Sequence, residues 1–182
     1  MSAGPQPPLC FTCGAFEFLS PADAPAILDL YARCADYFLL QDGELAVMSD
    51  ADELFTDVPP SKRPEDQYVL GFRREGRLDA VAALLPHHPQ PGDWYLGLLL
   101  VTPDLRSKGV GREMYESIEQ WSVSRGAQRM LLAVLEENAP AYRFWRSLGF
   151  EPVRRVEPAT FKRKLHVRYE LARRLECVSA DR

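Results

Sequence analysis

The sequence predicts an α/β fold in which helices cover a largely antiparallel sheet of about six or seven strands. Three observations carry the prediction: short apolar runs typical of strands, helical spacing of apolar residues between some of these runs, and turn residues at their boundaries. The chain has 182 residues, and 46% of them are apolar. We therefore expect one domain over residues 1–182 with a substantial core, preceded by a flexible tail at residues 1–8.

The first half of the chain alternates strand and helix signals. A strand is expected over Phe11–Leu19. Ser20 then caps a helix that runs to about Cys34, with Pro21 at its first position and Asp23 as a capping-box partner. The other expected elements of this half are an irregular acidic stretch at 37–64 with a short helix at 50–55, and two antiparallel strands at 67–72 and 77–84.

The second half begins with a central strand at 93–101, after a proline-rich loop. Apolar residues then recur at helical spacing from Val110 to Trp121, and Gly126 ends that helix. The remaining expected elements are a buried strand at 129–135, a helix at 140–148, and a closing hairpin with strands at 151–156 and 161–171.

The segment between the central strand and the next helix carries the strongest functional signal. It reads Val-Thr-Pro-Asp-Leu-Arg-Ser-Lys-Gly-Val-Gly-Arg from Val101 to Arg112. A helix N-terminus has unpaired backbone N–H groups and the positive end of the helix dipole, so it suits a phosphate group. Gly109 and Gly111 have no Cβ and let a ligand approach the backbone closely.

Two familiar phosphate loops do not fit this segment. A P-loop has Lys followed by Ser or Thr directly after its second glycine, whereas Gly111 is followed by Arg112 and Glu113. A dinucleotide-binding fingerprint has a third small residue at the position of Met114, which is bulky.

The pattern Arg-x-x-Gly-x-Gly after Val-x-Pro resembles the acetyl-CoA pyrophosphate loop of the GNAT N-acetyltransferase superfamily. A second string, from Asn138 to Phe150, is similar to the family's downstream signature: Asn, a later Ala, an apolar-aromatic pair and a final Gly-Phe. Asn138 would cap this helix and Gly149 would end it. The resemblance covers residues of about 94 to 150, and the N-terminal third resembles the family only in its order of elements.

The resemblance implies an N-acetyltransferase that uses acetyl-CoA as co-substrate and acetylates a primary amine by direct attack in a ternary complex. It also implies that the central strands splay apart to form the CoA cleft. Backbone amides from Ser107 to Arg112 would hold the pyrophosphate, and the pantetheine arm would pair with the strand at Leu99 and Val101. The residues implied in cofactor binding are Leu99, Leu100, Val101, Arg106, Ser107, Lys108, Gly109, Val110, Gly111, Arg112, Asn138, Ala141 and Trp145.

For catalysis, the resemblance implies an oxyanion donor, a base and an acid. The N–H near Leu99 would hold the developing oxyanion, and Asp93 and Tyr95 occupy the two commonest positions of the base. Many family members carry a tyrosine acid where this chain has Trp145, and an indole N–H does not release its proton usefully near neutral pH. Tyr142, a water molecule, or unassisted departure of the thiolate stays open as the replacement.

The acceptor site would be built by the first helices and the closing hairpin. Tyr31, Tyr37 and Phe38 are the expected substrate-binding residues, and nearby Asp36 and Asp42 add acidic character that suits an alkyl-ammonium group. The acceptor is a small-molecule or peptide amine, and the sequence does not distinguish a peptide N-terminus, a lysine, a polyamine, an antibiotic or a small metabolite.

Composition excludes several other classes. The net charge of −4 argues against nucleic acid as a partner. No apolar run approaches the roughly 20 residues that span a bilayer, and the N-terminus lacks the pattern of a signal peptide, so no membrane partner is expected. A homodimer stays open.

The four cysteines are expected to be free thiols in a cytoplasmic protein, because Cys10-x-x-Cys13 has no second pair. No metal is expected, since no His, Cys and carboxylate cluster has ligand spacing. The alternative function is a non-catalytic acyl-CoA-binding sensor module.

Overall fold

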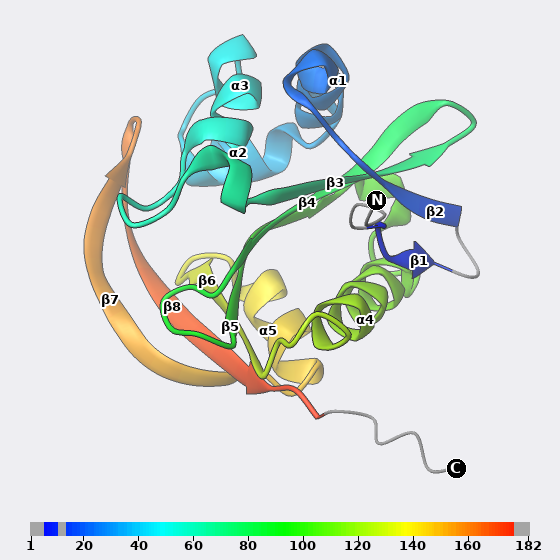
Figure 1. The fold of residues 1–182 in the computed structure, drawn as a ribbon. Helices are drawn as coiled ribbons and strands as arrows, with labels where there is room; N and C mark the ends of the chain where they lie inside the picture. Colours follow the sequence, from blue (N-terminus) through cyan, green and yellow to red (C-terminus); the bar gives the residue numbers. More distant parts are fainter. Residues whose placement is uncertain (1–5, 11–13, 177–182) are drawn as a thin grey trace.

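The computed structural model describes residues 6–10 and 14–176. These residues form one mixed sheet with the strand order β1-β2-β3-β4-β5-β6-β8-β7 (Figure 1). Only β5 and β6 are parallel neighbours. The strands are β1 (Leu9–Cys10), β2 (Gly14–Phe18), β3 (Tyr68–Arg74), β4 (Arg77–Pro86), β5 (Asp93–Val101), β6 (Arg129–Leu135), β7 (Glu151–Phe161) and β8 (Lys164–Arg174). The predicted fold class is confirmed, with the two-residue β1 added to the seven longer strands.

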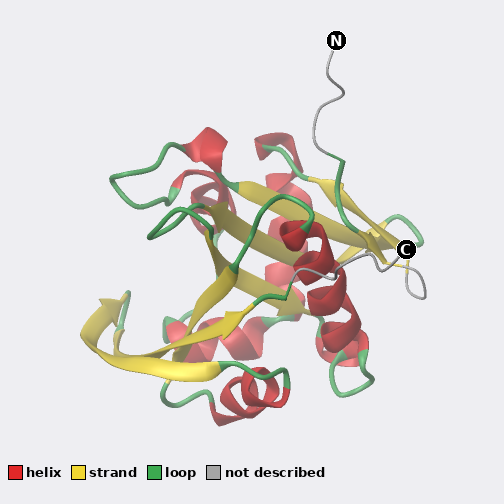
Figure 2. Cartoon of the chain, turned by 60° about the horizontal axis from the view of Figure 1, so that its bottom comes forward, coloured by secondary structure: helices red, strands yellow, loops and turns green. Residues whose placement is uncertain are grey.

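Helices cover both faces of the sheet (Figures 1 and 2). One face carries α1 (Ala24–Arg33), α2 (Ala35–Gln41) and α3 (Met48–Thr56), and the other carries α4 (Val110–Val123) and α5 (Ala139–Ser147). Three short 3-10 turns precede α1, β3 and α4: η1 (Pro21–Asp23), η2 (Pro64–Asp66) and η3 (Pro103–Leu105).

Side-chain alternation along β5 supplies a separate core to each face. Leu96 and Leu99 pack into the core beneath α4 and α5. Leu98 and Leu100 point the other way, into the core beneath α1, α2 and α3. Leu98, Leu99 and Leu100 alternate between the faces, and an extra residue at Gly97 puts Leu96 on the same face as Leu99. This one apolar run therefore packs against both helical layers.

The structure differs from the sequence prediction at α2, where an irregular segment was expected. Asp36, Tyr37 and Phe38 have modest helix propensity, so the local signal is weak. Burial of Phe38 against Tyr31, with ring centroids 4.5 Å apart, stabilises the helix through tertiary packing instead.

The closing hairpin is also longer than predicted. Its two strands run for 11 residues each and meet at a turn beside Lys162 and Arg163. The register shifts between Val156 and Ala159, just after the expected end of the first strand at Val156. A bulge therefore replaces the expected break between the strands.

Part of the expected N-terminal tail is packed against α4. The Trp121 indole donates a hydrogen bond to the carbonyl of Gln6 at 2.6 Å, and Pro8 is buried. Residues 1–5 and 11–13, which belong to the expected tail and first strand, lie outside the described residues.

Candidate functional site

The two central strands diverge after a short parallel contact. β5 and β6 pair only where Asp93–Tyr95 faces Arg129–Leu131. Further along, β5 stays paired with β4 as far as Val101, and β6 stays paired with β8 as far as Leu135. Gly97 is an extra residue on β5, since Ala83 and Leu84 of β4 face Leu98 and Leu96. Such a bulge bends a strand, and the facing edges of β5 and β6 are left open.

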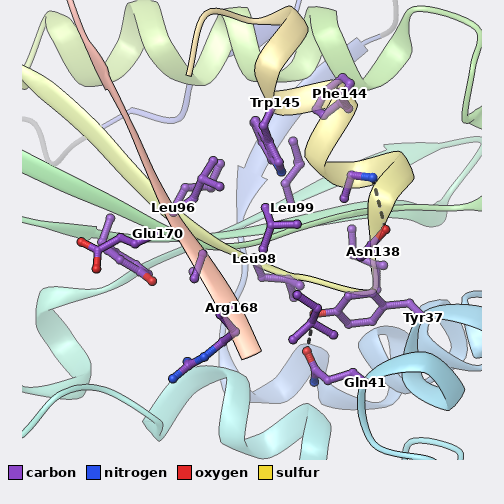
Figure 3. Close-up of a pocket in the computed structure, with 18 of the residues that line it drawn as sticks. Tyr37, Gln41, Leu96, Leu98, Leu99, Asn138, Phe144, Trp145, Arg168 and Glu170 are labelled. Atoms are coloured by element: carbon purple, nitrogen blue, oxygen red, sulfur yellow. Dashed lines mark hydrogen bonds between the residues drawn. The ribbon is translucent and has the colours of Figure 1, made fainter. Parts of the chain in front are cut away.

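The diverging ends of β5 and β6 leave a cleft of about 1360 Å³ between them, and its lining includes residues from both faces of the sheet. Phe144 and Trp145 reach it from α5, and Tyr37 and Gln41 reach it from α2 on the opposite face (Figure 3). β8 contributes Arg168 and Glu170 along one side. The cleft can therefore receive one ligand from each face of the sheet.

The open edge of β5 presents backbone groups at the predicted residues. The amide of Thr102 donates to Asp79 O on β4 at 3.1 Å. Because backbone groups alternate between the two edges of a strand, those of Leu99 and Val101 face the cleft. The Val101 carbonyl already accepts from Arg106 Nε at 2.8 Å. The groups of Leu99 are thus the better placed to pair with an extended ligand.

The glycine loop turns the chain from η3 into α4 at the end of β5. Ser107 and Gly109 have φ of 59° and 83°, in the left-handed region. The first amide bonded within the helix is that of Glu113, which donates to Gly109 O at 3.1 Å. The amides of Val110, Gly111 and Arg112 precede it and have no intrahelical acceptor, as at any helix start. A Cβ on Gly109 would meet no atom within 4 Å, so the loop faces open space.

Arg106 is committed to an ion pair rather than to the open space of the cleft. Its guanidinium bonds both carboxylate oxygens of Asp36 at the start of α2. The pKa of Asp36 is lowered, chiefly by this hydrogen bond from Arg106. Arg106 therefore ties the glycine loop to α2. Lys108 and Val110 lie outside the cleft lining, whereas Ser107, Gly109, Gly111 and Arg112 belong to it.

The α5 signature forms another wall of the cleft, on the face of the sheet that α4 and α5 cover. Asn138 Oδ1 accepts from Ala141 N at 3.2 Å and caps the helix, as the sequence indicated. Trp145 is 7% exposed and packs edge-on against Tyr115 and Phe150, with centroids 5.5 and 5.3 Å away. The indole thus fills space beside the cleft.

Two of the predicted catalytic side chains do not reach the cleft. The Tyr142 ring packs against Tyr169, with centroids 5.6 Å apart, and lies outside the lining. Asp93 is 5% exposed, also lies outside, and is held by Arg129 Nε and Nη2 at 2.9 and 2.6 Å. Because the Asp93 carboxylate is buried and Arg129 bonds both of its oxygens, Asp93 is assigned to the junction of β5 and β6.

Tyr95 does line the cleft, on the face covered by α1, α2 and α3. Burial raises the pKa of its phenol, and Glu170 raises it further. Glu170 is 13% exposed and accepts from Arg154 Nε at 2.6 Å. The sequence contained one signal for Glu170 and Arg168, since charged residues two apart share a strand face. The sequence pattern assigns their strand to the closing hairpin and gives neither residue a role.

The predicted acceptor residues separate into two groups. Tyr31 and Phe38 are 3% and 5% exposed and belong to the core beneath α1, α2 and α3, so they do not contact a ligand in the cleft. Tyr37 lines the cleft, and its hydroxyl donates to Gln41 Oε1 at 2.6 Å. Burial raises the pKa of Tyr37, so its phenol is neutral near pH 7.

Cys34 is a buried free thiol, as expected. The Cys10 side chain, Cys13 and Cys177 lie outside the described part of the chain. Within residues 6–10 and 14–176, no group of three or more His, Cys, Asp or Glu side chains is placed to hold a metal ion. None of the described helices is both long enough and apolar enough to cross a membrane.

Comparisons with known proteins agree with this geometry. A family model described as the Acetyltransferase (GNAT) family matches residues 25–150, more than half of the chain. The uncharacterized N-acetyltransferase YobR of Bacillus subtilis (strain 168) is 35% identical over 63 residues, 34% of this chain and 26% of that protein. The match thus spans about a quarter of that relative's length.

Two solved structures share the fold. An acetyltransferase from Thermus thermophilus superposes with a TM-score of 0.68 at 21% identity, over 88% of this chain and 96% of that one. The ribosomal-protein-S18-alanine N-acetyltransferase from Escherichia coli gives a TM-score of 0.64 at 18% identity, over 92% and 97%. With the family model, the cleft and the glycine loop in agreement, the chain belongs to the GNAT family of acetyltransferases.

Proposed function

We propose that this protein transfers the acetyl group of acetyl-CoA to a primary amine of a small molecule or peptide, by direct attack in a ternary complex. The observation that carries the proposal is the cleft between β5 and β6. At one end of the cleft lies the glycine loop, where the first amides of α4 have no acceptor within the helix. On the opposite face of the sheet the cleft is lined by titratable side chains.

The cofactor face has the groups that acetyl-CoA needs. The amides of Val110, Gly111 and Arg112 bind the pyrophosphate, where the α4 dipole favours negative charge. The β5 edge at Leu99 pairs with the pantetheine amides, and Trp145 packs against the arm. Five uncharged residues line this part of the cleft beyond the loop: Leu99, Asn138, Ala141, Phe144 and Trp145.

The reaction forms an N–C bond and breaks the C–S bond of the thioester. The amine loses a proton before or during attack, and the thiolate gains one on leaving. The Leu99 N–H stabilises the oxyanion, an interaction typically worth about 3 kcal/mol in the barrier. Glu170 accepts the amine proton through a water molecule that the neutral Tyr95 phenol helps to position.

The thiolate leaves on the α5 side without a phenol beside it, since Tyr142 is packed against Tyr169. A thiol with an ordinary pKa of about 8.5 is a fair leaving group near neutral pH. Water therefore supplies the proton that the family's tyrosine supplies elsewhere.

Two measurements on the purified protein test this proposal. Acetyl-CoA is expected to raise the melting temperature, and ATP and NAD are not. Free thiol is then expected to appear when acetyl-CoA is incubated with a panel of amines. Stabilisation without thiol release from any amine would support the acyl-CoA sensor instead, and stabilisation by ATP or NAD alone would contradict CoA binding altogether.

A further inference from the structure

A guanidinium without an acidic partner lies on the acceptor face of the cleft. Arg168 of β8 lines the cleft and makes no ion pair with any described residue. Its Nε is buried and has no hydrogen-bond partner in residues 6–10 and 14–176. The contact that holds the side chain is the ring of Phe161, whose centroid is 5.2 Å from Arg168 Cζ.

The other three arginines that line the described cleft are all partnered. Arg106 is paired with Asp36, and Arg154 is paired with Glu170. Arg112 lies 3.6 Å from Glu116 and also donates to the oxygens of Ser147. The positive charge of Arg168 is therefore left for something that enters the cleft.

Arg168 is on the wrong face of the sheet to bind the CoA pyrophosphate. Side chains two apart on a strand share a face, so Arg168 points the same way as Glu170, while Leu171 packs into the opposite core beneath α4 and α5. Tyr95 lines the same cleft as Arg168 and Glu170. The pKa of its phenol is raised by burial and, to a smaller extent, by Glu170. Arg168 and Glu170, the proposed base, thus lie on the same side of β8 along the cleft (Figure 3).

An unpaired guanidinium in a partly buried site has a clear chemical complement. Its planar N–H donors match the two oxygens of a carboxylate or a phosphate. A buried donor without an acceptor is destabilising, and an anionic ligand would supply the missing acceptor. The contact with Phe161 restrains the Arg168 guanidinium before a ligand binds, so less side-chain entropy is lost on binding.

We infer that the acceptor is an amine that also carries an anionic oxygen group, which Arg168 binds while the amine nitrogen lies next to Glu170. This inference rests on the proposed acetyl transfer and narrows its substrate class to amino acids, amino phosphates or close relatives. It disfavours polyamines and simple alkylamines, whose cationic chains would meet Arg168.

The test uses pairs of amines that differ in the anion: phenylalanine and phenethylamine, lysine and cadaverine, O-phosphoethanolamine and ethanolamine. For each, kcat/KM is measured from CoA thiol release by the full chain. The anionic member of at least one pair is expected to be preferred by about tenfold or more, the ratio that 1.4 kcal/mol gives. The carboxylate and phosphate pairs distinguish the two sources of the anion.

Arg168→Gln is expected to remove that preference by raising KM for the anionic amine alone, and Arg168→Lys to restore part of it. The matched control is Arg174→Gln, an exposed arginine on the same strand outside the cleft. The melting temperature of Arg168→Gln without ligand should change little, because the variant loses the contact with Phe161 but no intramolecular ion pair. If Arg168→Gln is less stable and loses kcat/KM equally for both amines of each pair, the role of Arg168 is structural and the inference is wrong.

The outcomes separate this inference from the function beneath it. If the wild-type protein acetylates the amines with and without the anionic group equally well, the inference about Arg168 is wrong while acetyl transfer stands. If acetyl-CoA binds and no amine in the panel releases thiol, the proposed acetyl transfer is itself contradicted.

Discussion

At position 145 an indole occupies the place where many family members carry a tyrosine. The ring is packed against three aromatic neighbours, the nearest being Phe144 at 4.8 Å between centroids. We expect Trp145→Phe to keep kcat within about threefold, because no proton donor is lost, and to lower the free energy of unfolding by about 1–2 kcal/mol through lost packing. A hundredfold fall in kcat in a fully stable variant would instead place the indole in the chemistry.

Tyr95 offers a pH test at the residue scale. Because burial raises its pKa, the phenol stays protonated between about pH 6 and 9 and acts only through hydrogen bonds. Tyr95→Phe is expected to lower kcat by about tenfold without moving the apparent pKa values of the rate profile. Tyr142→Phe is expected to change neither quantity. Disappearance of an alkaline limb in Tyr95→Phe would show that its ionisation matters.

Single residues also show which parts of the candidate site the sequence could predict and which it could not. The order Val-x-Pro followed by Arg-x-x-Gly-x-Gly identified the glycine loop, because that site is made by consecutive residues. From the sequence, Tyr31, Tyr37 and Phe38 have the same expected role in binding the substrate. Of these three residues, Tyr37 alone lines the cleft, and the other two are buried in the core. The direction of a helical side chain depends on which face packs against the sheet, and an isolated short segment does not specify it.

At the scale of elements, the glycine loop and α4 form the proposed phosphate site. Gly109 and Gly126 have similar φ, 83° and 87°, and a Cβ at either would contact nothing within 4 Å. Alanine at each should therefore cost a similar amount of stability, about 1–2 kcal/mol. Only Gly109→Ala is expected to weaken acetyl-CoA binding, by about tenfold or more, as measured by calorimetry. Equal affinities of the two variants for acetyl-CoA would show that the glycine loop does not bind the cofactor.

The long β7–β8 hairpin is anchored over the acceptor side by its tip. Lys162 bonds Asp50 of α3 at 2.7 Å, the Arg163 amide donates to Asp42 O at 3.1 Å, and His166 Nε2 lies 2.9 Å from Gln41 O. Figure 1 shows the tip beside α2 and α3. This contact positions the β8 face that carries Arg168 and Glu170.

Loosening that contact should affect the acceptor and spare the cofactor. Lys162→Met is expected to raise the acceptor KM by about fivefold, the effect of roughly 1 kcal/mol from a partly exposed pair, with the acetyl-CoA Kd unchanged. Arg63→Met, which breaks a pair with Asp66 away from the cleft, is the control. Loss of acetyl-CoA affinity in Lys162→Met would mean that the hairpin supports the whole cleft.

The elements that sequence patterns predicted best are those with their own local signal. β5 and β6 begin and end where expected, because apolar runs bounded by turn residues define them. α2 and the full length of β7 and β8 were not predicted, since burial of Phe38 and the docking of the hairpin tip are long-range interactions that no window of sequence contains.

Across the whole molecule, the cleft joins the two proposed ligand sites on opposite faces of one sheet. The proposed cofactor half comes from segments whose residues are close in the sequence, at β5, the loop and α5, and sequence motifs mark these segments. The proposed acceptor half combines side chains from α2, β5 and β8, which are far apart in the sequence. It can therefore be predicted only when the order of strands in the sheet is known.

This arrangement predicts a sequential kinetic mechanism. With both substrates in the cleft together, initial-rate plots should intersect, and CoA should compete with acetyl-CoA. Cys34 is fully buried, so it is not available to form an acetyl-enzyme intermediate. Parallel initial-rate lines, with an acetylated protein detected by mass spectrometry, would contradict direct transfer.

The central claim is that the helix amides after Gly109 hold the CoA pyrophosphate and that the β5 edge aligns the thioester. A crystal structure of the protein with CoA measures this directly. We expect pyrophosphate oxygens within about 3 Å of the amides of Val110, Gly111 and Arg112, and pantetheine paired with Leu99. A cofactor bound elsewhere, or one whose pyrophosphate touches side chains only, would contradict the account.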